Sequence, residues 1–312
     1  MQLSVIICTH NPRPDYLRRV LDALRAQTLP KEQWELLLID NASNVPLAKS
    51  WNLSWHPHAR HLHEEELGLT PARLRGIKES KSEFSIFVDD DNVLAADYLA
   101  GTLSIFNTRP ELGVIGGSIK GEFEIPPPDW IAPYLEGLVI CELERDYWSN
   151  LGGWSRAEPY GAGMCVRRAV ATDYYQKATS SPLRKLLGRS GTALSAGEDS
   201  DMAMCAIDLG LGTGRFCALK LTHLIPRGRL TEEYVIRLFA GFAAAKEIAA
   251  VLRPNGQVNQ SPSWKKTARF WFDYLRASGL KRRMLAAANK ARKHAREMIA
   301  KYSENQLGTV LL

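Results

Sequence analysis

The segment Leu3-Ser4-Val5-Ile6-Ile7-Cys8 decides the fold class, because it is short, apolar and rich in β-branched residues. Such a run predicts a strand that is buried on both faces. A polar turn from Thr9 to Pro14 follows it, and residues 15–27 then place apolar side chains at helical spacing, which predicts an amphipathic helix. A buried strand followed at once by a helix is the repeating unit of a parallel α/β sheet.

The same alternation continues along the chain. Residues 36–39 and 84–88 predict two more buried strands, each followed by aspartate, and residues 113–119 predict another. Residues 70–80 and 95–107 have the pattern of helices. The sequence therefore predicts an α/β fold with a Rossmann-like, mostly parallel sheet flanked by helices on both faces. Polar residues just after the strand ends lie where open α/β sheets bind ligands.

Two regions interrupt this pattern. Residues 121–165 contain three consecutive prolines, a glycine pair and many aromatic residues, which fits either a mobile loop region or a long excursion packed through its aromatic side chains. Residues 178–197 are rich in Ser, Gly, Arg and Lys and predict a flexible loop. A capped helix is predicted from Thr231 to about Leu252, and the chain after Trp264 is predicted to be mainly helical, with a break near Ser278.

The composition is that of an ordinary globular protein, with 312 residues, 45% hydrophobic and 24% charged, and it excludes disorder, collagen and coiled coil. The five cysteines are scattered without a CxxC pair, which predicts reduced thiols in a cytoplasmic protein and no zinc site. We find no run of eighteen apolar residues and no charged leader, so neither a membrane span nor a secretion signal is expected.

The positive charge is concentrated near the C-terminus. Residues 264–301 hold twelve Lys/Arg and two acids, a net +10, so the remainder of the +6 chain sums to −4. This uneven distribution argues against nucleic acid as a partner. Aromatic and basic residues combined on helices suit an anionic membrane surface, and the equally weighted alternative is a helix packed on the main domain with a solvated basic face.

The strongest local motif is Asp89-Asp90-Asp91-Asn92 at the end of a predicted strand. Adjacent carboxylates raise one another's pKa unless a cation compensates them. Hard oxygen ligands of this kind suit Mg²⁺ or Mn²⁺, and a solvated acidic turn is the alternative.

Two further motifs carry acidic or imidazole groups. Gly197-Glu198-Asp199-Ser200-Asp201 leads into a helix, so its carboxylates either cap that helix or include a general base held ionised by the helix dipole. His223 follows an apolar run and is either structural or a third metal ligand beside two carboxylates. Neither GxxxxGK[ST] nor a GxGxxG after the first strand is present, so a phosphorylated ligand would depend on a metal and on side chains such as Arg73.

Taken in order, these motifs resemble those of a family 2 glycosyltransferase with the GT-A fold, over roughly residues 2–240. The resemblance rests on six segments, namely Ser4–Asn11, Leu38–Ser43, Gly68–Arg73, Phe87–Asp91, Gly161–Met164 and Gly197–Asp199. It implies a glycosyltransferase domain over residues 1–240, with a donor half to about 120 and an acceptor half from about 121. Residues 241–312 would form a helical, basic extension.

The resemblance also implies site residues. Asp199 matches the catalytic base of the family. The donor would be bound by Thr9, Asn11, Asp40, Arg73, Asp89 and Asp90. Gly161, Ala162, Gly163 and Glu198 would border the donor sugar and the acceptor, and Asp91, Asp89 and His223 would hold Mn²⁺ or Mg²⁺. Two positions depart from the family pattern, because His10 replaces a common tyrosine and Leu74 replaces a common asparagine.

The resemblance implies an inverting transfer from a nucleotide-diphosphate sugar, most often a UDP-sugar, to a hydroxyl of a glycan or lipid-linked acceptor. Family members often act in bacterial polysaccharide or cell-envelope assembly, so the expected location is the cytoplasm, with peripheral contact to the inner face of the membrane through residues 264–301. A non-catalytic sugar-nucleotide-binding scaffold is the main alternative, and a nucleotidyltransferase is less favoured because the chain lacks the Gly-rich basic N-terminal loop of that class.

Overall fold

The computed structural model describes residues 1–152, 155–189, 191, 194–253, 272–277 and 279–310. In this part of the chain nine strands form one sheet in the order β3-β2-β1-β4-β8-β6-β9-β5, with β7 beside β9. The strands are β1 (Leu3–Thr9), β2 (Trp34–Asn41), β3 (Ala59–Glu64), β4 (Phe84–Asp89), β5 (Asn92–Leu94), β6 (Leu112–Phe123), β7 (Tyr147–Ser149), β8 (Cys165–Arg167) and β9 (Gly212–Ile225).

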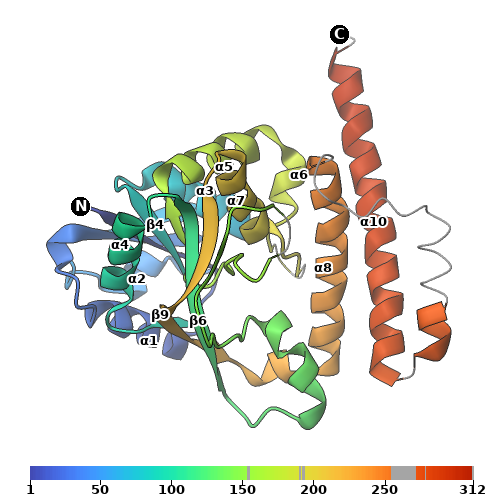
Figure 1. Cartoon of the computed structure of the whole chain (residues 1–312), viewed down its shortest axis with the longest axis horizontal. Helices are drawn as coiled ribbons and strands as arrows, with labels where there is room; N and C mark the ends of the chain where they lie inside the picture. Colours follow the sequence, from blue (N-terminus) through green and yellow to red (C-terminus); the bar gives the residue numbers. More distant parts are fainter. Residues whose placement is uncertain (153–154, 190, 192–193, 254–271, 278, 311–312) are drawn as a thin grey trace.

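Helices cover both faces of this sheet, and the two long C-terminal helices lie beside it (Figure 1). The helices are α1 (Pro14–Arg25), α2 (Leu47–Ser50), α3 (Leu69–Glu79), α4 (Tyr98–Thr108), α5 (Arg168–Ser180), α6 (Pro182–Lys185), α7 (Glu198–Asp208), α8 (Glu232–Leu252) and α10 (Gly279–Val310), with short 3₁₀ turns η1 (Lys31–Gln33), η2 (Asp129–Leu138) and η3 (Arg227–Leu230). The predicted strands and helices of the first 120 residues are all present, so the α/β fold class is confirmed.

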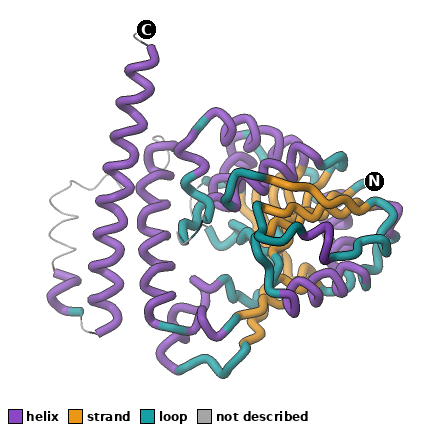
Figure 2. Tube along the Cα trace, turned by 180° about the vertical axis from the view of Figure 1, so that it is seen from behind, coloured by secondary structure: helices purple, strands orange, loops and turns teal. Residues whose placement is uncertain are grey.

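Strand β1 is apolar and buried on both faces, as is typical of a central strand in a parallel sheet. Leu3, Val5 and Ile7 of β1 pack in one hydrophobic cluster with α1 and α4. Ile6 and Cys8 point the other way, into a cluster with α3, α5 and α7. Strands β3, β2, β1 and β4 are parallel neighbours, and β6 is parallel to β9. Figure 2 shows the strands gathered together with helices around them. The short strands β5, β7 and β8 run antiparallel to their partners and are too short for the sequence pattern to predict.

Of the two alternatives for residues 121–165, aromatic packing is the one observed. Trp130 and Tyr134 of η2 pack against α8, where the rings of Tyr134 and Phe239 meet edge to face at 5.5 Å. The β6 and β9 strands run side by side into this region and carry η2 and η3 to one side of the α/β body (Figure 1). Gly153 and Trp154 lie outside the described residues.

The expectation of a flexible loop over 178–197 is wrong for its first half. Helix α5 continues to Ser180 and α6 follows directly. Arg184 is buried because it forms an ion pair with Asp201, and Leu187 is buried against α8. Contacts with buried partners therefore stabilise helical structure in residues 178–187, although their composition is polar.

The C-terminal helices pair with each other beside the α/β body (Figure 1). Helix α8 begins as predicted, since the hydroxyl of Thr231 accepts a hydrogen bond from the Tyr234 amide at 3.2 Å. Ala295 of α10 packs near Ile248 of α8, and Arg296 pairs with Glu247 at 2.8 Å. The aromatic and basic residues from Trp264 to Trp271 lie outside the described residues.

Candidate functional site

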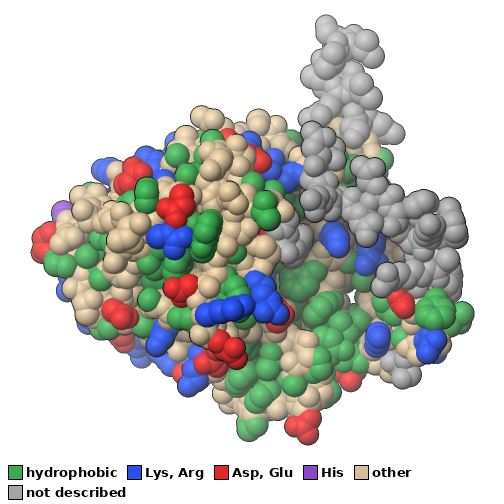
Figure 3. Space-filling view, in the orientation of Figure 1, with side chains coloured by type: hydrophobic (Ala, Val, Ile, Leu, Met, Phe, Trp, Pro, Cys, Tyr) green, Lys and Arg blue, Asp and Glu red, His purple; other side chains and the backbone are tan. Residues whose placement is uncertain are grey.

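A cleft of about 800 Å³ lies at the carboxyl ends of β1, β2 and β4, bordered on its far side by η2 and α8. The space-filling view shows the face beside α8 hollowed (Figure 3). The cleft brings together ten of the residues predicted from the sequence, namely Thr9, Arg73, Asp89, Asp90, Asp91, Gly161, Ala162, Glu198, Asp199 and His223. Two acidic motifs that are far apart in the chain therefore face one cavity.

Three predicted residues lie beside the cleft without lining it. Asn11 is exposed, with φ 48°, and its side-chain oxygen accepts a hydrogen bond from the Asn44 amide at 2.9 Å. Asp40 is buried beneath the same loop. Gly163 has φ +70°, which favours glycine, and its carbonyl accepts the hydroxyl hydrogen of Tyr98 at 2.7 Å.

Asp40 organises the loop that follows β2. Its two carboxylate oxygens accept the backbone N–H groups of Ser43 and Leu47, at 3.0 and 2.9 Å. Burial acts to raise the pKa of Asp40, but these hydrogen bonds to the ionised form leave the pKa below its ordinary value. His10, which stands where the family pattern commonly has a tyrosine, contacts its neighbours on the β2 side. Its Nδ1 lies 2.8 Å from the Asn41 carbonyl oxygen.

The three aspartates at the end of β4 have different surroundings. Burial, together with the neighbouring Asp91, raises the pKa of Asp90 to about 7, although Thr9 donates a hydrogen bond to its carboxylate. Burial also acts to raise the pKa of Asp91, but the Arg229 guanidinium holds this pKa well below its usual range. The mutual repulsion expected from the sequence is thus relieved differently at each carboxyl.

Arg229 is a residue of η3 that the sequence analysis missed. Its Nη2 donates to Oδ2 of Asp91 at 2.8 Å, and its Nη1 contacts Nε2 of His223 at 2.9 Å. The same Asp91 oxygen lies 3.4 Å from Nε2 of His223, and both side chains are buried. The sequence shows only that two arginines follow Pro226 in a short turn. This pattern is too common to predict a contact with Asp91.

These residues fit a divalent cation. A carboxylate oxygen of Asp91 and the imidazole nitrogen of His223 converge on a single cationic group, which is the Arg229 guanidinium in the structure. Asp89 lies at the same strand end, with its side chain 36% exposed toward the cleft. Two carboxylates with one imidazole form a donor set suited to Mn²⁺ or Mg²⁺.

Arg73 connects the two acidic motifs. Its guanidinium lies 3.4 Å from Oδ1 of Asp89 and 3.3 Å from Oε1 of Glu198, and only 3% of the Arg73 side chain is exposed. Burial and the nearby Asp199 raise the pKa of Glu198 to about 7, against the effect of Arg73. A Cβ atom on Gly161 would lie 2.9 Å from Nη2 of Arg73, so a larger residue here would displace the guanidinium.

Asp199 lies in the first turn of α7, as the sequence predicted. Its Oδ2 accepts the Gly161 N–H at 3.0 Å and its Oδ1 accepts the Ser200 N–H at 2.9 Å. Glu158, which the sequence analysis missed, also lines the cleft near Asp199, and burial raises its pKa.

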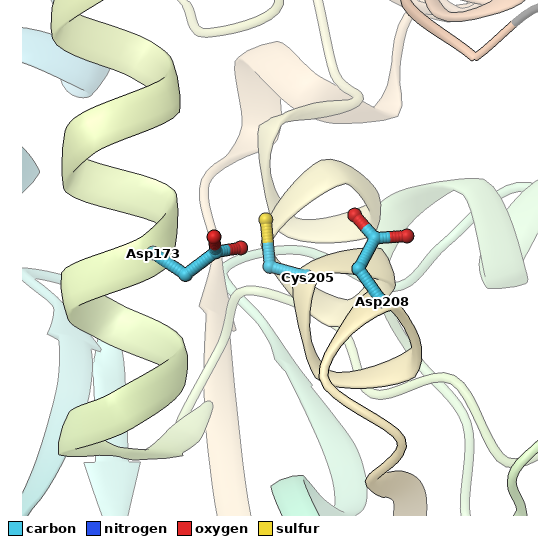
Figure 4. A group of neighbouring side chains, drawn as sticks. All are labelled: Asp173, Cys205 and Asp208. Atoms are coloured by element: carbon cyan, nitrogen blue, oxygen red, sulfur yellow. The ribbon is translucent and has the colours of Figure 1, made fainter.

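A second acidic group lies outside the cleft, where Asp173, Cys205 and Asp208 come within 4.8 Å of one another (Figure 4). Lys177 contacts both carboxylates, at 2.6 and 2.8 Å, and Arg253 pairs with Asp208 at 2.8 Å. Burial raises the pKa of the Cys205 thiol to about 12, which disfavours a thiolate ligand. Basic side chains therefore already balance this group, which we interpret as structural.

The architecture is that of the GT-A fold, and the comparisons with known proteins agree with it. Residues 4–153 match the family model described as Glycosyl transferase family 2. The S. aureus TarS 1-349 structure in complex with UDP has a TM-score of 0.51 and 16% identity, over 96% of this chain and 92% of that one. The corresponding complex with UDP-GlcNAc has a TM-score of 0.51 and 14% identity, over 95% of this chain and 92% of that one.

Several sequence relatives carry glycosyltransferase names, and two of them show the extent of the similarity. Glycosyltransferase AglE of Haloferax volcanii is 29% identical over 147 residues, which cover 46% of this chain and 47% of AglE. The uncharacterized glycosyltransferase YibD of Escherichia coli is 35% identical over 104 residues, which cover 31% of this chain and 28% of YibD. These matches span less than half the length of either relative. Residues 4–153, just under half of the chain, are therefore similar to glycosyltransferase family 2, and the chain has the GT-A fold of TarS.

Proposed function

We propose that this protein transfers a sugar from a nucleotide-diphosphate sugar to a hydroxyl group of a saccharide acceptor, with inversion at the anomeric carbon. A UDP-sugar is the favoured donor. The observation that carries the proposal is the single cleft shared by Asp199 and the β4 aspartates, with Arg73 in contact with both acidic motifs. UDP and UDP-GlcNAc bound to TarS, a protein of the same fold, support a uridine nucleotide as the first donor to test.

Each residue has a proposed part in one displacement. Asp199 accepts the proton of the acceptor hydroxyl while that oxygen forms a bond to the anomeric carbon. The bond from the anomeric carbon to the diphosphate oxygen breaks with its electron pair, and one displacement from the opposite face inverts the configuration. Arg73 lies between Asp89 and Glu198 and orients both carboxylates toward the cleft.

A divalent cation would be held by Asp91, Asp89 and His223. When bound, Mn²⁺ or Mg²⁺ would supply positive charge against the negative charge that develops on the leaving diphosphate. Arg229, which contacts Asp91 and His223, supplies positive charge at the same place from the protein itself.

The proposal is tested by thermal unfolding with UDP, GDP, dTDP and CDP, each with and without Mn²⁺. A ligand that binds only the native state raises its stability by RT ln(1 + [L]/Kd). We expect a metal-dependent stabilisation by UDP, followed by slow hydrolysis of UDP-sugars when no acceptor is present. Binding without hydrolysis would favour a sugar-nucleotide-binding scaffold, and the absence of stabilisation by any nucleotide would contradict the proposal.

We further propose that the acceptor is a glycan or a lipid-linked saccharide and that α10 brings the enzyme to an anionic membrane surface. Lys281, Lys290 and Lys293 of α10 are exposed, and none has an ion pair among the described residues. Arg283 and Arg296 instead pair with Glu232 and Glu247 of α8. One set of charges thus attaches α10 to α8, while another set remains available to a surface. No described helix is long and apolar enough to span a bilayer.

A further inference from the structure

Arg215 is a buried cation for which the described part of the chain supplies no anionic partner. It lies on β9 with 4% of its surface exposed, and its Nε and Nη2 have no hydrogen-bond acceptor among the described residues. Its Nη1 makes one long contact, of 3.5 Å, with the Arg156 carbonyl. An unpaired buried charge is costly, so such a group indicates a partner that the folded chain itself does not provide.

Arg215 lines the cleft next to the proposed base. Its Cζ lies 4.7 Å from the ring centroid of Tyr160, which packs between Arg215 and the cavity wall formed by η2. The next residue, Gly161, donates its N–H to Asp199. Arg215 and the proposed base therefore line the same cleft and are connected through two consecutive residues, Tyr160 and Gly161.

The neighbouring charged groups do not neutralise Arg215. Glu136 is engaged by the hydroxyl of Tyr160 at 3.0 Å, and Glu158 is placed near Ser200 and Asp199. Arg156 also lines the cleft and adds positive charge to the same wall. The diphosphate of a donor is expected elsewhere, at the β4 end, where Arg73 and Arg229 contact the aspartates.

We propose that Arg215 forms an anion subsite for the acceptor, so that the acceptor is a saccharide bearing a carboxylate or a phosphate near the attacking hydroxyl. This inference rests on the proposed glycosyltransferase function and deepens it by naming the acceptor class. Tyr160 covers one face of the guanidinium, which leaves its edge to form charge-assisted hydrogen bonds with an anion.

The test is ligand-observed NMR with the full chain, UDP and diamagnetic Mg²⁺, using three probes: methyl glucoside, methyl glucuronide and glucose 6-phosphate. We expect the anionic sugars to bind roughly tenfold or more tightly than the neutral one, the size of one charge-assisted hydrogen bond. The carboxylate and phosphate probes distinguish the two sources of charge. Arg215→Gln should abolish the preference, and Arg215→Lys should retain part of it.

Arg167→Gln is the matched control, because Arg167 is also largely buried against aromatic rings, Phe84 and Phe106, but does not line the cleft. It should lower stability and leave the charge preference intact.

Equal binding of neutral and anionic sugars overturns the inference, and so does the absence of binding of the anionic sugars at millimolar concentration. A preference for anionic sugars that survives in Arg215→Gln also overturns it. UDP binding is measured in the same samples. If the unaltered protein does not bind UDP, the proposed function is refuted. If it binds UDP but shows no preference for anionic sugars, only the acceptor inference is refuted.

Discussion

The two walls of the cleft are built in different ways. The wall formed by the ends of β1, β2 and β4 takes its polar groups from residues that directly follow strands, and Asp40 is held by backbone amides three and seven residues away. The opposite wall takes Glu198, Tyr160, Arg215 and Arg229 from separate segments of the second half of the chain. Its charges are balanced across the cleft, as in the pairs Arg73–Glu198 and Arg229–Asp91. Local backbone geometry thus fixes the first wall, and tertiary ion pairs fix the second.

Asp199→Asn should have the largest effect, because it removes the proposed base from the second wall and leaves the first wall intact. We expect turnover to fall by roughly 10²–10⁴-fold, the range of general-base catalysis, while UDP affinity stays nearly unchanged. The measurement is the rate of UDP-sugar hydrolysis together with a UDP titration. Ser200→Ala, one residue further along α7, is the control, and near-normal turnover in Asp199→Asn would refute the assignment.

Glu198→Gln tests whether the charges of the second wall make stability depend on pH. The pKa of Glu198 is raised from 4.5 to about 7, so the folded protein binds this proton more tightly than the unfolded chain does. The contribution of Glu198 to stability is therefore fully present below pH 4.5 and is lost as the pH rises to about 7, an effect of up to roughly 3 kcal/mol.

We accordingly expect Glu198→Gln to gain stability relative to the unaltered protein as the pH rises through that range. Urea unfolding at several pH values measures the difference in free energy of unfolding. A difference that stays constant with pH would contradict the burial and charge environment described for Glu198.

Asp40→Asn makes the corresponding change in the first wall. An amide nitrogen cannot accept a backbone N–H, so one of the hydrogen bonds to Ser43 and Leu47 is lost, at a cost of about 1–2 kcal/mol in unfolding free energy. Because the pKa of Asp40 is lowered, its contribution is present above the ordinary value of 3.8 and disappears as the pH falls. The cost of the substitution, measured by urea unfolding, should therefore shrink in acid, the opposite direction to Glu198. A cost that grows in acid would contradict the comparison.

Arg229→Gln tests the contact that joins the two walls. Removing a cation 2.8 Å from Asp91 should raise the affinity of the free protein for Mn²⁺ by roughly tenfold, because the metal no longer competes with a positive charge. Titration of Mn²⁺ alone, followed by its electron paramagnetic resonance signal, measures this without turnover. Arg227→Gln, on the exposed side of the same turn, should leave the affinity unchanged. Weaker Mn²⁺ binding in Arg229→Gln would show that the guanidinium supports the metal site.

The smallest expected effect lies outside both walls. Lys290→Gln should weaken binding to anionic vesicles by roughly fivefold or less, since one basic residue near a membrane contributes about 1 kcal/mol. Lys49→Gln in α2 removes the same charge from a distant part of the molecule and should have no effect (Figure 1). Vesicle sedimentation measures both variants, and equal losses would argue against a specific membrane-facing role for α10.

Much of the first wall could be predicted because short-range signals encode it. Buried parallel strands have continuous apolar runs, so β1, β2 and β4 and the aspartates that end them are visible in the sequence. The second wall gave weaker signals, since Arg229, Arg215 and Glu158 resemble ordinary surface residues in sequence. Residues 178–187 show the same limit, because Arg184 gains its buried position from Asp201 on another helix.

The sequence by itself determined the α/β alternation, the acidic strand end and the carboxylates at the start of α7, because apolar periodicity and residue type at strand and helix ends are local properties. The tertiary structure alone decided which charges meet. It placed Arg73 between Asp89 and Glu198 and Arg229 against Asp91 and His223. It also placed Arg215 in the cleft without a counter-ion among the residues that the structure describes. The energy of a charge depends on burial and on its nearest opposite charge, and both are set by how distant segments pack.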